Sequence, residues 1–163
     1  MTSRRKFLGG TALAGLLGLV AISRFRGTDA DAAGKFEIEK TDAEWKKQLS
    51  PQQYDVLRKA GTERPFSSPL NDEHGRGTFA CAGCDLPLFA SETKFESGTG
   101  WPSFYQPLPN AVETRNDNSI FMTRIEVHCR RCGGHLGHVF DDGPAPTGKR
   151  YCMNGVAMKF IPA

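Results

Sequence analysis

Four of the five cysteines of this chain stand in two identical spacings, Cys81-x-x-Cys84 and Cys129-x-x-Cys132. A C-x-x-C turn directs two thiolates toward one point, so two such turns supply the four sulfur ligands of a tetrahedral zinc ion. Four sulfur ligands leave no open coordination position, which predicts a structural zinc rather than a catalytic one. The alternatives are two disulfides and a thioredoxin-like redox pair, although the sequence has no βαβ pattern to favour the latter.

The fifth cysteine, Cys152, follows two histidines, His135 and His138, and Asn154 lies two residues beyond it. A lone cysteine is usually a small buried apolar residue. A thiolate beside imidazoles, in contrast, is a nucleophile with acid–base help, and this chemistry needs a thiol pKa below the free value of about 8.5. Residues 135 and 138 would share one face of a helix but point to opposite faces of a regular strand, so their spacing leaves the arrangement open.

Two short helices are predicted ahead of these residues. Thr41-x-x-Glu44 is a capping box that starts a helix through Trp45 to Leu49. Ser50-Pro-Gln-Gln53 starts a second helix, since it has an N-cap serine, a proline at the first helical position and a glutamine three residues after the cap. Gly61 is expected to end it.

Short strands are predicted in the remainder of the chain. After about residue 66, turn-forming residues recur every few positions between short aromatic and β-branched runs. The clearest strand runs from Ser119 to His128, with alternate residues on each face. One face holds Phe121, Thr123, Ile125 and Val127, and the other Met122, Arg124, Glu126 and His128. We therefore predict an α+β fold, mostly antiparallel β, with helices confined to the N-terminal side.

Residues 1–32 have the pattern of an export signal. Arg4, Arg5 and Lys6 precede a short apolar run, Gly9 to Ile22, which is brief for a membrane span. The paired arginines followed by Phe-Leu resemble a twin-arginine signal, and Ala30-Asp-Ala32 offers a cleavage site. We expect a mature domain at residues 33–163, exported to the periplasm or the outer face of the cytoplasmic membrane; an uncleaved membrane tether is the alternative.

The net charge of +3 comes from the first 32 residues. Of the 21 basic and 18 acidic residues, five and two lie there, so the remaining chain has 16 of each. This neutral body argues against a nucleic-acid-binding protein that depends on bulk charge.

Several collinear segments covering about Leu49 to Pro162 resemble methionine sulfoxide reductase B. The segments are Gly61-Thr-Glu-Arg-Pro-Phe66, Cys81-x-x-Cys84, Ser97-Gly-Thr-Gly-Trp-Pro-Ser-Phe104, Cys129-x-x-Cys132, His135-Leu-Gly-His-Val-Phe140, Asp142-Gly-Pro144 and Arg150-Tyr-Cys-Met-Asn-Gly155. The resemblance implies two antiparallel β-sheets with peripheral N-terminal helices, tied by structural zinc. It also implies reduction of methionine (R)-sulfoxide in proteins or peptides, a repair of oxidative damage that uses no organic cofactor.

The resemblance also implies a role for each site residue. Cys152 matches the nucleophile, which becomes a sulfenic acid as methionine is released. His135 and His138 match the groups that handle the sulfoxide oxygen and its proton, and Asn154 supports their hydrogen bonds. Trp101 matches the aromatic wall that receives the substrate's methyl group, although an indole is as often ordinary core.

The chain differs from many members of that family at the third position of the S-G-x-G-W segment. A resolving cysteine is common there, whereas this chain has Thr99. We therefore predict a one-cysteine enzyme, reduced by an external thiol or dithiol such as a thioredoxin-like protein. The other expected partners are oxidised proteins or peptides and the twin-arginine export machinery. A monomer without nucleic-acid partners is expected, and the competing interpretation is a catalytically silent, zinc-stabilised binding module.

Overall fold

The computed structural model describes residues 36–118 and 123–163 of the 163-residue chain. All of them belong to one compact unit, Gly34–Ala163. The predicted export signal at residues 1–32 and positions 119–122 of the predicted strand lie outside the described residues. Within the described ranges, no helix is both long enough and apolar enough to cross a membrane.

The two predicted helices are confirmed as α1 (Asp42–Gln48) and α2 (Pro51–Lys59). Both capping boxes are present, because the Thr41 and Ser50 side chains accept backbone N–H groups while the side chains three residues later accept the cap N–H groups. The end of α2 differs by one residue from the prediction. Ala60, not Gly61, takes the left-handed conformation that closes the helix, with φ of 54°.

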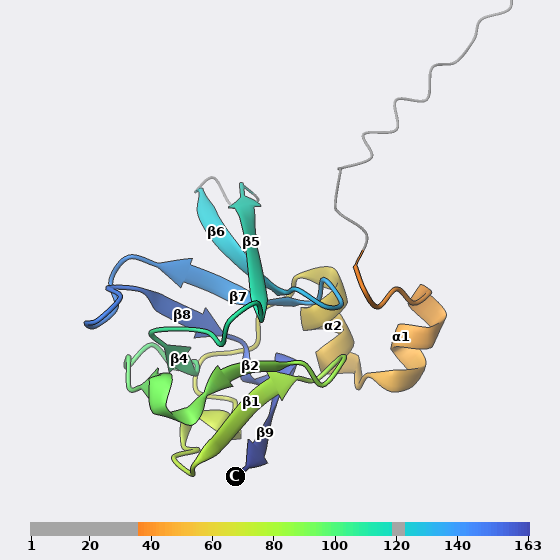
Figure 1. Ribbon diagram of the computed structural model, residues 1–163. Coiled ribbons are helices and arrows are strands. Elements are labelled where there is room, and N and C mark those ends of the chain that lie inside the picture. Colours follow the sequence, from red (N-terminus) through yellow and green to blue (C-terminus); the bar gives the residue numbers. More distant parts are fainter. Residues whose placement is uncertain (1–35, 119–122) are drawn as a thin grey trace, which may run out of the picture. The chain divides into compact units, whose positions relative to one another are not determined.

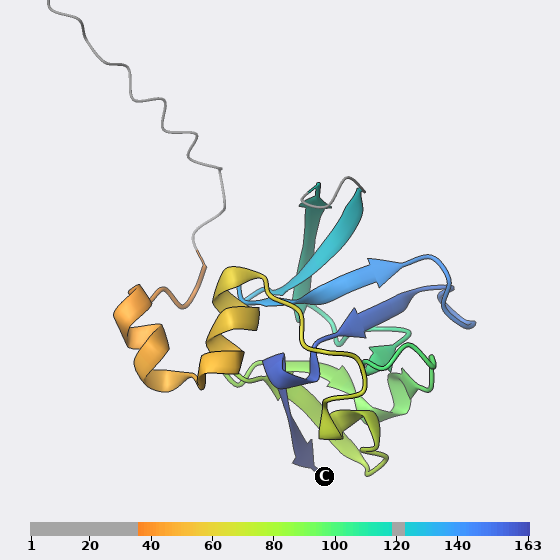
Figure 2. The same ribbon diagram turned by 180° about the vertical axis from the view of Figure 1, so that it is seen from behind.

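The strands of the described residues form two antiparallel sheets (Figures 1 and 2). The smaller sheet has the order β2-β1-β9 and the larger the order β3-β4-β8-β7-β6-β5. Their bounds are β1 Gly77–Cys81, β2 Pro87–Ala90, β3 Lys94–Phe95, β4 Ser103–Phe104, β5 Val112–Asp117, β6 Arg124–Cys129, β7 His135–Phe140, β8 Arg150–Met153 and β9 Met158–Pro162. Three short 3-10 helices connect them: η1 Pro69–Asn71, η2 Ser91–Thr93 and η3 Gly155–Ala157.

The core of the protein lies between the two sheets. Phe79 of β1, Phe89 of β2 and Phe104 of β4 are all fully buried. The Phe104 ring lies 4.3 Å from that of Phe89 and 4.9 Å from that of Phe79, measured between centroids. An aromatic side chain of the larger sheet thus packs against two from the smaller one, and burial of these rings holds the sheets together.

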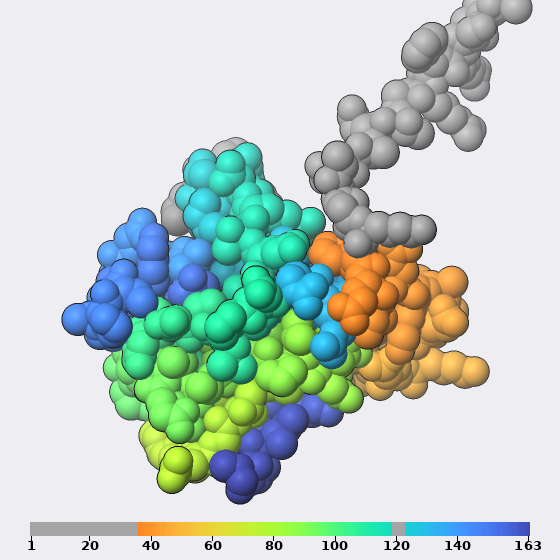
Figure 3. All heavy atoms as spheres, viewed as in Figure 1, coloured from red at the N-terminus to blue at the C-terminus, as the bar shows by residue number. Residues whose placement is uncertain are grey.

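The predicted α+β class is confirmed. Figure 3 shows the dark blue atoms of β9, an edge strand of the smaller sheet, beside the yellow-green atoms of the adjoining part of the same chain.

The predicted strand at Ser119–His128 is only partly correct. Among the described residues, β6 starts at Arg124 and continues to Cys129. Within this strand Glu126 is 4% exposed and Val127 is fully buried, whereas Ile125 is 36% exposed, so both faces are partly buried. The polar face of this strand points into the molecule, toward the candidate site.

Candidate active site

Cys152 and His138 lie opposite each other on two central strands of the larger sheet. His138 of β7 pairs with Cys152 of β8 in the antiparallel register. Directly opposite side chains in such a pair share one face of the sheet and are close neighbours. On its other side Cys152 pairs with Ser103 of β4. The thiol is therefore held in the middle of a sheet.

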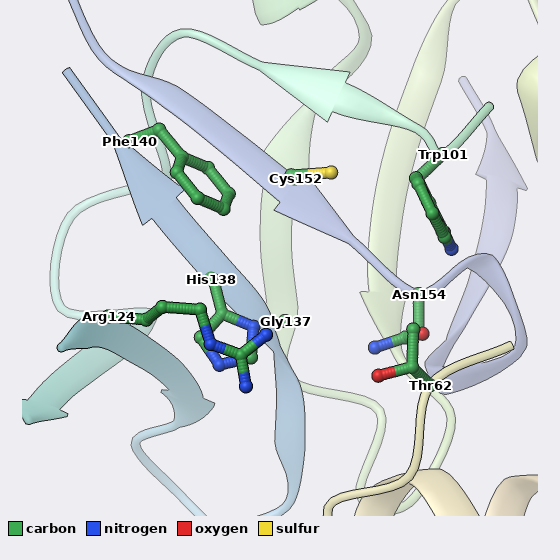
Figure 4. A pocket seen from close by; sticks show the side chains of 8 residues that line it. All are labelled: Thr62, Trp101, Arg124, Gly137, His138, Phe140, Cys152 and Asn154. Carbon is green, nitrogen blue, oxygen red and sulfur yellow. The ribbon is translucent and has the colours of Figure 1, made fainter. Parts of the chain in front are cut away.

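A pocket of about 120 Å³ opens over this pair (Figure 4). It is lined by Thr62, Trp101, Arg124, Gly137, His138, Phe140, Cys152 and Asn154. Figure 4 shows the sulfur of Cys152 directed toward Trp101, with His138 and Arg124 at one end of the pocket and Asn154 and Thr62 at the other. Cys152, His138, Asn154 and Trp101, which come from separate segments of the sequence, are thus brought together.

His135 lines a second, larger cavity of about 470 Å³ rather than the Cys152 pocket. The two cavities share Thr62, Arg124 and His138. The rings of His135 and His138 are nevertheless close, with centroids 5.4 Å apart. The reason is an irregularity in the β6–β7 pairing between Val127 and His128, where an extra β7 residue shifts the register. Such a bulge reorients the side chains on one side of it, so the two histidines share a face that a regular strand would deny them.

Each histidine has a carboxylate partner that the sequence analysis did not identify. The Nδ1 atom of His135 lies 2.7 Å from a carboxylate oxygen of Glu126, and Nε2 of His138 lies 2.8 Å from one of Asp117. Arg115 and Arg124 in turn pair with these carboxylates. One signal was available in the sequence. Glu126 is a charged residue within the clearest predicted strand, where it shares a face with His128.

Two hydroxyl groups, of Thr99 and Ser103, lie beside the Cys152 thiol, and the Ser97 hydroxyl links them. The Oγ1 atom of Thr99 lies 3.9 Å from Sγ, and the Ser97 hydroxyl contacts both the Thr99 hydroxyl at 2.8 Å and the Ser103 hydroxyl at 2.7 Å. Burial raises the pKa of Cys152, and the opposing effects of Thr99, Arg150 and Ser103 do not outweigh it. This direction differs from the lowered pKa expected from the sequence, because a cysteine within a sheet loses much of its hydration.

Glu63 joins three parts of the site. Its carbonyl oxygen accepts a hydrogen bond from the Trp101 indole at 3.2 Å, and its backbone N–H donates to the Asn154 side chain at 3.0 Å. Its carboxylate accepts the backbone N–H groups of Gly155 and Val156. The segment Gly61–Phe66, noted in the sequence only as a match, thus holds the pocket wall and the chain after Cys152 together.

The four remaining cysteines form a compact cluster away from this pocket. Their sulfur atoms all lie within 4.8 Å of one another, and none is in a disulfide. Cys81 ends β1, which belongs to the smaller sheet, while Cys129 ends β6, which belongs to the larger. The cluster therefore joins the two sheets, as expected for paired C-x-x-C turns.

The geometry of this cluster fits a tetrahedral metal ion. The closest sulfur pairs, Cys81 with Cys132 and Cys84 with Cys129, are 3.8 and 3.5 Å apart. Four sulfur ligands at 2.3 Å from a central zinc would be about 3.8 Å from one another. The four predicted ligands are thus placed where they could hold a metal ion, and the disulfide alternative does not fit the distances.

Comparison with known proteins agrees with this geometry. A SelR domain profile matches residues 49–162. The peptide methionine sulfoxide reductase MsrB of Methanosarcina barkeri is 60% identical over 124 residues, which cover 76% of this chain and 87% of the relative. The protein of the same name from Agrobacterium fabrum is 53% identical over 127 residues, covering 77% and 94%. That from Leptospira interrogans is 52% identical over 126 residues, covering 77% and 96%. On these matches and on its fold, the chain belongs to the methionine sulfoxide reductase B family.

Proposed function

We propose that this protein reduces methionine (R)-sulfoxide in oxidised proteins and peptides to methionine, with an external thiol as reductant. Family membership supports sulfoxide reduction and the use of a thiol. The observation that carries the proposal for this chain is the pairing of Cys152 with His138 across β7 and β8, beneath a small pocket walled by Trp101. Oxidised methionine is the substrate that such a thiol–imidazole–aromatic pocket fits.

The proposed first step transfers the sulfoxide oxygen to Cys152. Burial raises the pKa of Cys152 and lowers that of His138, so the thiol keeps its proton and the imidazole is neutral at pH 7. His138 can therefore accept the thiol proton as the sulfur attacks and pass it to the sulfoxide oxygen. The S–O bond of the substrate breaks as a new S–O bond forms on Cys152. Methionine leaves reduced, and the cysteine is oxidised to a sulfenic acid that carries the original thiol proton.

His135, Asn154 and Trp101 complete this proposal. Asn154 donates its side-chain N–H to the Leu136 carbonyl at 3.0 Å, which fixes the amide at the pocket edge. His135, with its ring 5.4 Å from that of His138, is assigned to the hydrogen-bond network around the oxygen. Trp101 offers an apolar face for the methyl group of the sulfoxide, which would select one epimer by placing the oxygen toward the histidines.

Recovery of Cys152 requires a second thiol from outside the chain. Thr99 stands beside Cys152 Sγ where many family members carry a resolving cysteine, and the other four cysteines lie together in the metal cluster. An external thiol would attack the sulfenic acid, releasing water and forming a mixed disulfide, and another thiol would then reduce that disulfide. A dithiol such as a thioredoxin-like protein could supply both sulfur atoms.

The metal of the cysteine cluster is proposed to be zinc with a structural role. Four thiolates would satisfy its tetrahedral coordination and leave no position for substrate. Residues 1–32 are proposed as a twin-arginine export signal that delivers the domain at residues 33–163 outside the cytoplasm. The N-terminus of the mature protein, determined by mass spectrometry of the exported fraction, tests that assignment directly.

The proposed reaction is tested with wild-type protein and Cys152→Ser, each given the two methionine sulfoxide epimers and a chemical dithiol. Loss of the R epimer alone, abolished in the variant, is the expected result. Zinc content and far-UV circular dichroism must match between the two proteins. A folded, metal-loaded wild-type protein that consumes neither epimer, even for one turnover, would reject the enzyme in favour of a silent binding module.

A further inference from the structure

Each site histidine belongs to a three-residue row that crosses three strands of the larger sheet. One row is Arg115, Glu126 and His135, and the other is Arg124, Asp117 and His138. In both, one carboxylate contacts an arginine as well as an imidazole. The hairpin formed by β5 and β6 supplies both carboxylates and both arginines, and β7 supplies the histidines (Figure 1).

The strand register produces these rows. Arg115 of β5 lies directly opposite Glu126 of β6, and two positions further Asp117 of β5 lies opposite Arg124 of β6. The order of acid and base is therefore inverted between the two rows. Glu126 in turn pairs with His138 in the β6–β7 register, which places its strand position beside the site. The bulge near His128 then brings His135 within reach of the Glu126 carboxylate.

The two carboxylates contact different nitrogen atoms of the two imidazoles. Glu126 accepts from Nδ1 of His135, which leaves Nε2 as the free ring nitrogen; that Nε2 is buried and has no hydrogen-bond partner within the described residues. Asp117 accepts from Nε2 of His138, which leaves Nδ1. A carboxylate at one ring nitrogen fixes the proton there and so selects the tautomer. The two histidines therefore offer opposite ring nitrogens to a ligand.

We propose that Glu126 and Asp117 are positioning residues that fix the tautomer and ring orientation of His135 and His138. The inference rests on the proposed function, in which these histidines handle the sulfoxide oxygen and its proton. A neutral imidazole whose proton is held at the carboxylate presents a lone pair to the site, which is what acceptance of the Cys152 proton requires. The arginine in each row pairs with the carboxylate and holds it in place.

Burial and charge support this role over a purely structural one. Burial acts to raise the pKa of Glu126, but hydrogen bonds from His135 and Arg115 outweigh it and hold the pKa at about 2. The side chains of Glu126 and His135 are 6% and 4% exposed. A buried pair such as Glu126 and His135 is a poor source of stability, because desolvation cancels much of its attraction. Its presence beside the pocket is therefore better explained by its effect on the imidazoles.

The test uses Glu126→Gln and Asp117→Asn in the full domain, with Glu92→Gln and Asp72→Asn as exposed controls of matched chemistry. Two-bond proton–nitrogen correlation spectra report the imidazole tautomers, and steady-state kinetics report kcat and KM. We expect a changed tautomer signature of His135 in the first variant and of His138 in the second. We also expect kcat to fall about tenfold or more, with KM changed by less than about twofold. Both controls should match wild type.

Three results would overturn the proposal. Wild-type tautomers in both variants would show that the carboxylates do not set them. Altered tautomers with an unchanged kcat would show that the setting does not matter to the reaction. A fall in kcat that tracks a lower melting temperature or metal content would assign the rows to stability. Because Asp117 lies near the hairpin end, its variant remains informative if Glu126→Gln folds poorly. A wild-type protein with the predicted tautomers but no reductase activity would reject the proposed function separately.

Discussion

The protein holds sulfur in two regions that differ in almost every physical respect. In the cysteine cluster, four thiols from two turns converge within 4.8 Å of one another and join the two sheets. In the pocket, one thiol stands in the middle of a strand, opposite an imidazole and beside hydroxyl groups. Cysteine sulfur therefore has a structural role where four of its atoms gather around one point. Sulfur is available for chemistry where a single thiol lies open to a cavity.

The largest effect is expected from the cluster. Cys129→Ser removes one of four ligands, and metal binding in such sites is coupled to folding by about 10 kcal/mol or more. We expect loss of the cooperative thermal transition and of stoichiometric zinc, and activity should vanish with the fold. Thermal denaturation and metal analysis check this. Cys152→Ser is the matched control, since it should keep both the transition and the metal. A stable, zinc-loaded Cys129→Ser protein would contradict the division between the two regions.

Next in size is an effect confined to the pocket. Trp101→Ala removes the apolar wall and should lower kcat/KM for the R epimer about 10- to 100-fold, mainly through KM, with weaker discrimination between epimers. The metal content should stay at the wild-type value. Trp101→Phe is the control, because it keeps an aromatic face without the indole hydrogen bond to Glu63. Equal kinetics for the alanine variant and wild type would remove Trp101 from the site.

A smaller effect is expected where the pocket meets the fold. Glu63→Ala leaves the partly buried backbone N–H groups of Gly155 and Val156 without their acceptor. A buried donor without a partner costs about 1–3 kcal/mol, so the free energy of unfolding should fall by about that amount for this partly buried pair. Denaturant titration measures it, with Glu92→Ala as an exposed control. An unchanged midpoint would mean that the contacts of the Glu63 carboxylate do not stabilise the fold.

The smallest effect concerns the reactivity of the single thiol. The Thr99 hydroxyl lowers the pKa of Cys152 against the larger, raising effect of burial. Thr99→Val removes that hydroxyl, so the pKa should rise further and less thiolate should be present at pH 7. Loss of one such hydrogen bond should slow alkylation of Cys152 by iodoacetamide about two- to tenfold. Thr99→Ser should react like wild type. Faster alkylation of the valine variant would mean that the Thr99 hydroxyl does not lower the pKa of Cys152.

The parts of the molecule that could be predicted from sequence are those governed by short-range rules. Two capping boxes placed α1 and α2, and two C-x-x-C turns identified the cluster, because both signals are complete within a few residues. Family resemblance supplied Cys152, His138, Asn154 and Trp101, which the pocket brings together. Their roles remain predictions until the reaction is measured.

The parts that escaped prediction depend on long-range register. The bulge that turns His135 beside His138 arises only when β6 and β7 pair, and the Glu126 and Asp117 contacts require that pairing as well. The pKa of Cys152 could not be inferred from neighbouring residue types, since the dominant cause is burial within the sheet. Sequence spacing reports local geometry, whereas desolvation is set by the assembled fold.

The cysteine cluster has a topological consequence for the site. A metal bound by Cys84 and Cys129 closes a ring of chain in which 44 residues lie between the two ligands. Treated as a cross-link, such a closure reduces the conformational freedom of the unfolded chain by about 4 kcal/mol. Trp101 and Thr99 lie inside this ring, whereas His138 and Cys152 lie outside it. The wall of the pocket and its nucleophile thus come from opposite sides of the closure that a bound metal would make.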